Sequence, residues 1–201
     1  MRNYLIAVCL LFAGSVQAEY IVNTGSGGTS STGLVADANQ FLAGQFTLTD
    51  PYIISSVEGW FGPHSEGKLT AIIYDNKELE GTSVELPGNE LFSQQFLIDS
   101  PSTDDYAWDG AYGLSWELDP GTYWLAFEGQ PGVENWGWGW MPGEAPNPMS
   151  RYAVKPNWPT WEPLYGDYLG MRINAVPIPA AFWLFGSGLV CLIGFARRKK
   201  A

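Results

Sequence analysis

The sequence predicts an all-β protein, an antiparallel β-sandwich of jelly-roll type. Three observations support this fold class. Short stretches rich in aromatic and β-branched residues recur from residue 40 onward, separated by Gly, Pro, Asn and Asp. No window of about 11 residues in this region keeps the 3.6-residue period of a helix. The 24 Gly and 14 Pro interrupt almost every candidate helix.

The expected strands alternate apolar and polar residues, which places one side chain set on each face of a sheet. Apolar residues at every second position share one face in 69–73, 123–127 and 169–173. Turn signals stand at 87–89 and at Asp119-Pro120-Gly121-Thr122, whose Pro-Gly pair predicts a type II turn. Strands are expected at 41–48, 52–61, 68–74, 91–98, 112–118, 122–128, 133–140, 151–154 and 168–175.

The N-terminus reads as a targeting segment. Arg2 gives a positive start, Leu5 to Ala13 form an apolar core, and Val16-Gln17-Ala18 is a small-residue cleavage site. We therefore expect a signal peptide at 1–18. Residues 24–33 contain mainly Gly, Ser and Thr, so 19–39 is expected to be a flexible segment ahead of a sandwich domain at 40–175.

The C-terminus reads as a membrane segment. No charged residue occurs from Ile178 to Ala196, and a helix of that length would span roughly 28 Å, close to the thickness of the bilayer core. Four cations follow, which would hold the end of the chain in the cytoplasm. These cations are Arg197, Arg198, Lys199 and Lys200.

A motif of five residues precedes this apolar run: Val176, Pro177, Ile178, Pro179 and Ala180. Motif, apolar helix and basic end together resemble the PEP-CTERM sorting signal, in the variant class with VPLPA-like motifs. The resemblance covers 176–201, with Ile178 at the central position of the motif. It implies export, transient insertion in the inner membrane, and cleavage by an exosortase, a membrane-embedded Cys-dependent protease and transpeptidase.

The upstream region is also similar to β-sandwich ectodomains often found with such tails. This second resemblance covers roughly 40–130, including Gln45-Phe46-Thr47-Leu48 and the segment from Leu118 to Glu128. It implies a location at the cell surface or in the exopolysaccharide matrix. It supplies no catalytic residues.

Charge and cysteine content exclude several function classes. All 21 acidic residues lie in the exported part, against five basic ones, which leaves that part with a net charge of −16. Such a surface repels nucleic acid and anionic lipid, so neither is an expected partner. Cys9 and Cys191 fall in the terminal apolar segments, so the exported part has no disulfide, thiol nucleophile or thiolate metal site.

The most suggestive local feature is a row of tryptophans. In a strand, Trp136, Trp138 and Trp140 would share one face and leave only glycine on the other. Such a row could form a flat platform for sugar rings, with Asn135 hydrogen bonding at its edge. Packing of the rings in the core or in a loop is the alternative. Trp158 and Trp161 could extend the site or cover an edge of the core.

Other candidates for chemistry are weaker. Asp104, Asp105 and Asp109 in a predicted loop are a candidate Ca²⁺ site, against the alternative of a solvated acidic loop. His64, the single histidine, lies in a predicted turn without a Gly-x-Ser-x-Gly nucleophile motif in the chain. Carboxylate pairs such as Glu117 and Asp119 could serve a glycoside hydrolase, but many pairs exist in so acidic a chain.

The sequence therefore leads us to expect a non-enzymatic structural or adhesive protein of the cell surface or exopolysaccharide matrix. A carbohydrate-binding module that uses the tryptophan row is the alternative. A glycoside hydrolase and a permanently membrane-anchored surface protein are less favoured. No cofactor is expected apart from the candidate Ca²⁺, and the expected partners are an exosortase-type enzyme and exopolysaccharide.

Overall fold

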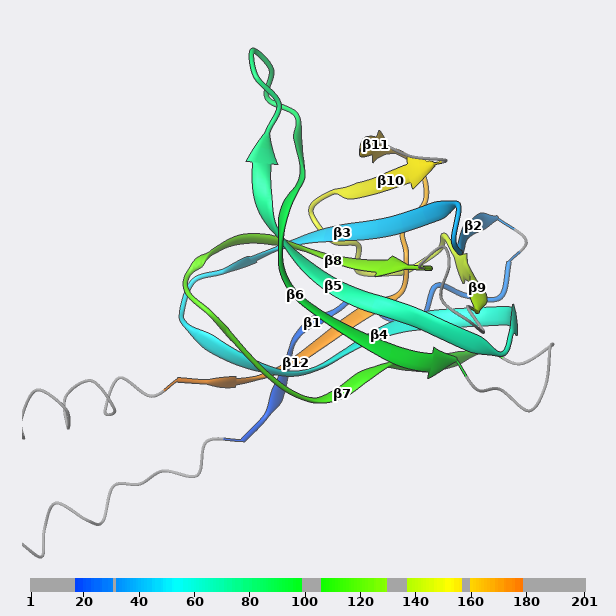
Figure 1. Cartoon of the computed structure of the whole chain (residues 1–201), viewed down its shortest axis with the longest axis horizontal. Coiled ribbons are helices and arrows are strands. Elements are labelled where there is room, and N and C mark those ends of the chain that lie inside the picture. The colour runs from blue at the N-terminus through cyan, green and yellow to red at the C-terminus, as the bar shows by residue number, and fades with distance from the viewer. Residues whose placement is uncertain (1–16, 31, 99–105, 130–136, 157–159, 179–201) are drawn as a thin grey trace, which may run out of the picture.

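The structure, a computed structural model, describes residues 17–30, 32–98, 106–129, 137–156 and 160–178. In this part of the chain the protein is all-β, with strands that pair antiparallel in two sheets. Figure 1 shows the two layers, with the first and the last described strand side by side. The all-β class and the antiparallel sandwich are confirmed.

The first sheet has β4 at its centre. β4 pairs along one edge with β7, and along the other with β12 and then β9. β1 extends the sheet beyond β12, and β2 extends it beyond β9. The strands are β1 (Glu19–Asn23), β2 (Gly33–Ala36), β4 (Tyr52–Ser65), β7 (Ala107–Leu118), β9 (Trp138–Pro142) and β12 (Met171–Pro177).

The second sheet has the order β11-β10-β3-β8-β5-β6. Its strands are β3 (Gln40–Leu48), β5 (Gly67–Glu78), β6 (Glu85–Ile98), β8 (Gly121–Glu128), β10 (Tyr152–Pro156) and β11 (Glu162–Leu164). β5 and β6 form a long hairpin, and its far end projects from the sandwich (Figure 1). Phe92 of β6 stacks on Trp116 of β7 at 5.6 Å between ring centroids, which closes one side of the sandwich.

The core fills the space between the two sheets, and the predicted alternation is confirmed. The apolar sets of 69–73, 125–127 and 169–173 all face this core. Arg172 and Asn174 point to the outer face of the first sheet. The physical reason is that successive side chains of a strand point to opposite faces. The inward face of a strand can therefore be predicted from its own sequence when one of its faces is apolar.

The structure differs from the expected flexible segment at 19–39. β1 pairs with β12, and β2 pairs with β9, so this segment contributes two strands to the first sheet. Thr24 is buried at 1% exposure, and its hydroxyl accepts a hydrogen bond of 2.7 Å from the amide of Met171. Composition suggested flexibility because it does not show the hydrogen-bonding partners that tertiary structure supplies.

Three predicted turns are also corrected. Residues 87–89 lie inside β6, and 62–65 form the end of β4. Gly121 does not have the positive φ that a type II turn needs at its third position. Its flanking strands β7 and β8 belong to different sheets, so the chain crosses the sandwich there instead of reversing in a hairpin.

The two predicted targeting segments fall almost entirely outside the described residues. Ile178 is described, and it continues the line of β12, so the expected helix at 178–196 does not begin there. Within the described residues, no helix has the length and apolar character that crossing a membrane would require.

Candidate functional site

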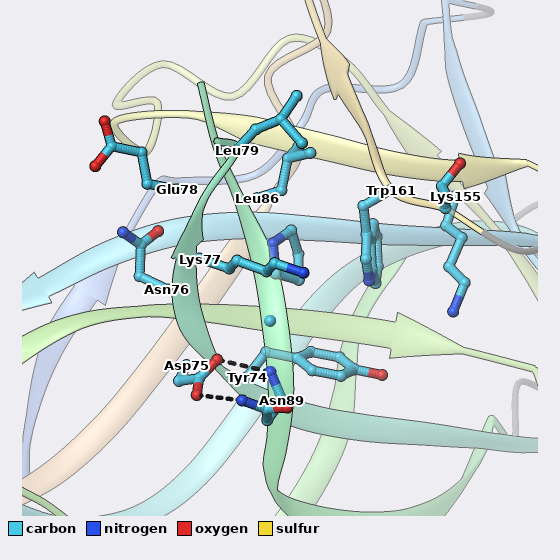
Figure 2. Close-up of a pocket in the computed structure, with 13 residues that line it drawn as sticks. Tyr74, Asp75, Asn76, Lys77, Glu78, Leu79, Leu86, Asn89, Lys155 and Trp161 are labelled. Atoms are coloured by element: carbon cyan, nitrogen blue, oxygen red, sulfur yellow. Dashed lines mark hydrogen bonds between the residues drawn. The ribbon is translucent and has the colours of Figure 1, made fainter. Parts of the chain in front are cut away.

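A hollow in the described part of the chain lies on the outer face of the second sheet. Its volume is about 940 Å³. One wall is the β5–β6 hairpin, and the opposite wall is formed by Lys155 of β10 with Thr160 and Trp161 (Figure 2). The pocket therefore lies on the face of the sheet that points away from the main core.

A break in strand pairing produces the hairpin wall. The register between β5 and β6 shifts on both sides of Tyr74, so β6 holds extra residues opposite Asp75. The carboxylate of Asp75 accepts hydrogen bonds from the backbone amide of Asn89 at 2.6 Å and from its side-chain amide at 2.9 Å (Figure 2). A Cβ on Gly88 would collide with the same carboxylate. Asp75 thus holds the bulge that bends the hairpin.

The aromatic part of the pocket comes from two rings. Trp161 meets Tyr74 edge to face, with centroids 5.8 Å apart and planes at 73°. The Lys155 Nζ lies 5.7 Å from the Trp161 centroid and 5.4 Å from that of Phe41. The Lys155 ammonium group is attracted to the indole of Trp161 by a cation–π interaction. Trp161 therefore both packs on the sheet and lines the pocket.

A small apolar cluster supports the pocket from below. It occupies the outer face of the second sheet and is separate from the main core. Trp124 of β8 is its largest member and is fully buried, and Leu86 and Trp161 pack against it. Its buried members are Ala43, Ile72, Tyr74, Trp124, Ala126 and Ala153.

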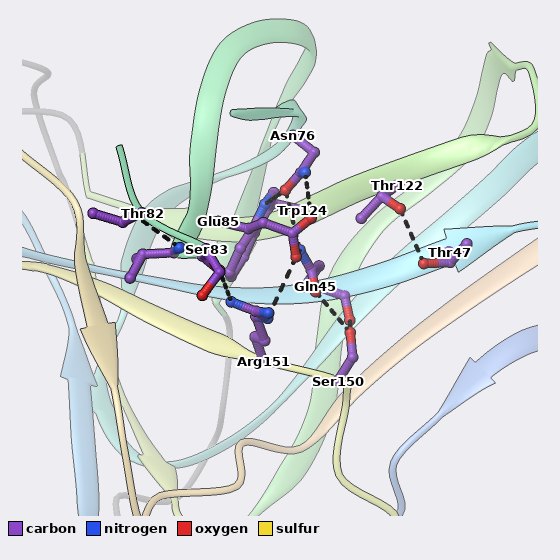
Figure 3. A network of polar contacts seen from close by, with 11 residues as sticks. Gln45, Thr47, Asn76, Thr82, Ser83, Glu85, Thr122, Trp124, Ser150 and Arg151 are labelled. Atoms are coloured by element: carbon purple, nitrogen blue, oxygen red, sulfur yellow. Dashed lines mark hydrogen bonds and ion pairs between the residues drawn. The ribbon is translucent and has the colours of Figure 1, made fainter. Parts of the chain in front are cut away.

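A polar network ties the base of the hairpin to the sheet (Figure 3). The Oδ1 of Asn76 accepts hydrogen bonds from the indole of Trp124 at 2.9 Å and from the side-chain amide of Gln45 at 3.0 Å. The side-chain amide of Asn76 donates to Glu85 at 3.0 Å. Because Gln45 and Trp124 are buried, each bond satisfies a donor that would otherwise lose its hydration.

The network ends in an ion pair across strands. The Arg151 Nε lies 3.4 Å from Glu85 Oε2, and a guanidinium nitrogen of Arg151 donates to the carbonyl of Ser83 at 3.1 Å. The hydrogen bond from Gln45, helped by Asn76 and Arg151, holds the pKa of Glu85 below its usual range. β10 and the hairpin are therefore joined beside the pocket wall.

A buried carboxyl lies beside the pocket. Glu128 is only 6% exposed, and its Oε1 accepts a hydrogen bond of 2.6 Å from the Tyr74 hydroxyl. Burial raises the pKa of Glu128 to about 7, although the Tyr74 hydroxyl and Lys155 lower it and Glu90 raises it further. Burial, with the nearby Glu128 charge, raises the pKa of Tyr74 as well. This pair therefore changes charge near neutral pH.

The formal charges that line the pocket balance. Asp75 and Glu78 stand against Lys77 and Lys155. Amide and hydroxyl groups of the lining add hydrogen-bond donors and acceptors, and two rings give it apolar faces. Such a surface suits a neutral, polyhydroxylated ligand better than a strongly charged one.

The predicted tryptophan row lies on the other sheet. Gly139 faces the core, where an added Cβ would approach the Phe61 ring to 2.7 Å. Trp138 and Trp140 therefore point to the outer face of the first sheet, and both are half-buried. Trp136 and Asn135 lie outside the described residues. Gly139 allows the two sheets to approach closely. The rings of Trp138 and Trp140 do not lie in the core.

Trp140 belongs to a group of rings on that outer face. It joins Trp60, Tyr106 and Trp108, and we call these four residues the outer aromatic face. Trp60 lies 5.4 Å from Trp108 and 6.3 Å from Tyr106 between centroids. Three of the four donate hydrogen bonds to consecutive carbonyls of the N-terminal segment. The pairs are Trp60 to Gly28, Tyr106 to Thr29 and Trp140 to Ser30.

Arg172 completes this face. Its guanidinium lies 3.7 Å from the ring centroid of Trp108 and 5.3 Å from that of Tyr20. Its Nε is buried without a hydrogen-bond partner among the described residues. Glu58, opposite Arg172 in the sheet, instead accepts a hydrogen bond of 3.0 Å from Tyr112. The rings of the face are thus engaged with one another and with the segment that crosses them.

The weaker candidates do not assemble into a site. Among the described residues, no group of three or more His, Cys, Asp or Glu could hold a metal ion. Asp109 lies in β7 instead of a loop, while Asp104 and Asp105 fall outside the described residues. The backbone of His64 pairs with Gly139. Glu117 lies in β7 and is exposed, and Asp119 follows that strand.

The pocket was missed at the sequence level, except for Trp161. The signal lies in residues 87–89, whose composition predicts a turn. A bulge and a turn use the same residue types, so composition does not separate them. The bulge is revealed by the register shifts between β5 and β6 and by the contact of Asp75 with Asn89, 14 positions away.

Comparisons with known proteins add no relative. No protein-family model, no curated protein and no solved structure matches the chain.

Proposed function

We propose that this protein is an exported surface or matrix protein whose sandwich binds a neutral polysaccharide in the pocket between the β5–β6 hairpin and Trp161. The domain acts as an adhesive module and does not catalyse a reaction. In this proposal the jelly-roll class expected from the sequence describes the scaffold, and the pocket is its ligand-bearing groove.

The observation that carries the proposal is the combination of Trp161 with a lining of balanced charge. The exposed part of an indole face offers a sugar ring an apolar surface, and surrounding amides and carboxylates bind its hydroxyls. Asp75 and Asn89 are pre-organised by their mutual hydrogen bonds, so little side-chain entropy is lost on binding.

Titration of the purified domain with polysaccharide from the producing cells tests this. We expect binding by calorimetry, and Trp161→Ala should weaken it by about tenfold, or about 1.4 kcal/mol. Tyr74→Phe keeps the ring and removes the hydroxyl, so it should reduce affinity less. Denaturant unfolding of both variants checks that the sheet is intact.

The predicted tryptophan row on the outer face of the first sheet is the second location for the same function, favoured by the outward direction of Trp138 and Trp140. Trp138→Ala and Trp140→Ala are therefore matched controls on the opposite sheet. Binding that survives these changes and is lost in Trp161→Ala supports the pocket. The reverse pattern assigns binding to the tryptophan row and refutes the pocket.

The absence of turnover is tested separately. Asp75 is bound to Asn89, and the proposal assigns it to positioning instead of acid–base chemistry. Incubation with the polysaccharide should release no reducing ends. Release that Glu128→Gln or Asp75→Asn abolishes, without loss of folding, would make the protein a glycoside hydrolase.

Delivery to the surface follows from the two ends of the chain. We propose signal-peptide removal before Glu19, transient insertion of the C-terminal apolar helix, and cutting near Pro177-Ile178-Pro179 by an exosortase-type enzyme. Replacing Pro177 and Pro179 with alanine should leave the tail attached in the inner membrane. Mass spectrometry of the mature C-terminus measures this, and an uncut wild-type tail would indicate permanent anchoring.

A further inference from the structure

The sorting motif begins inside the folded sandwich. β12 runs to Pro177, so it includes the first two residues of the motif. Val176 lies opposite Ile53 of β4, and Pro177 lies opposite Tyr52. The boundary between domain and tail expected at 175–176 is therefore not a structural boundary.

The pairing continues one residue further. The amide of Ile178, the central residue of the motif, donates a hydrogen bond of 3.1 Å to the carbonyl of Pro51. Val176, Pro177 and Ile178 are all half-buried. More than half of the motif is thus engaged with the N-terminal end of β4.

We propose that the folded sandwich masks its own processing site, and that the enzyme can cut only after the end of β12 separates from β4. The inference rests on the proposed sorting function. Proteases commonly bind an extended substrate through its backbone groups, as a strand binds a sheet edge. Backbone groups that already face β4 cannot serve the enzyme at the same time.

The separation can be local because the end of β12 is held on one side only. β1 begins at Glu19, opposite Ala175, so among the described strands Val176 and Pro177 pair with β4 alone. Pro51 has no N–H, so it cannot return a hydrogen bond to Ile178. The register shift between Asn174 and Ala175 interrupts the β12–β4 ladder just before these last pairs.

Opening of these last residues leaves the core untouched. Ala175 is fully buried, whereas the three residues that follow are only half-buried. A strand end with few buried contacts opens at lower free energy than the domain unfolds. The rate of cutting should then follow the fraction of molecules in which the end is open.

A spacer tests this in cells. Insertion of Gly-Ser-Gly-Ser between Ala175 and Val176 keeps the motif intact and moves it out of register with β4. We expect cutting about tenfold faster than in the unmodified chain, because the accessible fraction rises toward one. The same insertion after Gly81, at the exposed tip of the β5–β6 hairpin, is the matched control and should leave the rate unchanged.

Hydrogen exchange of the full-length chain in detergent tests the masking without the enzyme. The amides of Val176 and Ile178 should exchange more slowly than in a free peptide of the same sequence. The spacer variant should lose this protection. Exchange at free-peptide rates in the unmodified chain would overturn the proposal.

The two measurements separate the inference from the function on which it rests. If the amides are protected but the unmodified and spacer chains are cut at equal rates, masking does not limit the rate of cutting and the proposal is overturned. Protected amides with no cutting of either chain would refute the sorting function, and masking of a processing site would fall with it. Faster cutting of the spacer variant alone, with the control unchanged, supports both.

Discussion

The Tyr74 hydroxyl lies 2.6 Å from Oε1 of Glu128, in a place where the carboxyl is almost fully removed from water. The tyrosine ring forms part of the pocket, and the carboxyl lies beneath it on β8. This pair links the protonation of a buried group to the wall of the candidate binding site.

The first prediction concerns stability and pH. The folded pKa of Glu128, about 7, lies above the usual value of 4.5, so the folded state holds a proton that the unfolded state has released between these values. The binding of this proton contributes to the free energy of unfolding. That contribution is fully present below the unfolded pKa and is lost as pH rises through the folded pKa. From pH 5 to 8 the loss should be about 2 kcal/mol of unfolding free energy.

Urea unfolding at the two pH values measures this loss. Glu128→Gln keeps an acceptor for Tyr74 and cannot ionise, so its stability should change less over the same range. Glu117→Gln, on an exposed position of β7, is the control and should retain the wild-type difference. Equal pH dependence in wild type and Glu128→Gln would contradict the assignment.

The second prediction concerns the network beneath the pocket. Asn76→Ala removes the shared acceptor of the Trp124 indole and the Gln45 amide. The buried indole N–H is then unsatisfied, whereas the Gln45 amide keeps only its hydrogen bond to Glu85. We expect a loss of about 2 kcal/mol in unfolding free energy. Thr47→Ala removes an exposed side-chain contact with Thr122 and should cost far less. Similar losses in both variants would show that the network is not buried as described.

The third prediction concerns the packing of β9. Gly139→Ala places a methyl group about where the Phe61 ring now lies, so either ring or sheet must move. Such overpacking should cost about 1–3 kcal/mol. Thermal or urea unfolding measures the change. An unaltered stability would mean that Gly139 does not face the core, and that the direction of Trp138 and Trp140 is reversed.

The fourth prediction concerns the contact between Arg172 and Trp108. Its guanidinium stacks on the indole at 3.7 Å, within the range of cation–π attraction. A double-mutant cycle with Arg172→Gln and Trp108→Leu should give a coupling of about 0.5–2 kcal/mol. Arg172→Lys keeps the charge without the planar group and should recover only part of it. Additive losses would indicate that the two side chains do not interact.

Much of the fold could be predicted from the residues. Eight of the nine expected strands overlap a described strand over most of their length, because alternation of apolar and polar residues reports directly on burial of one face. β1 and β2 were missed because their sequences are short and lie beside a Gly-rich segment. Their strand conformation depends on partners more than a hundred positions away, in β12 and β9.

The site was harder to predict than the fold. Trp138 and Trp140 could be placed on a common face from their spacing, but the period of two does not say which face is outward. Gly139 decided this through its contact with Phe61, which only tertiary structure brings close. The pocket depends on Asp75, Asn89 and Trp161, whose positions in the chain show no regular pattern.

The sequence by itself determined the sandwich class, the acidic and cysteine-free composition of residues 19–176, and which residues of the regular strands turn inward. These properties follow from composition and from the local period of the chain. Tertiary structure decided which strands are neighbours, where β5 and β6 bend, and that Val176 to Ile178 lie against β4. Such features depend on contacts between distant residues, and a local pattern does not specify its distant partner.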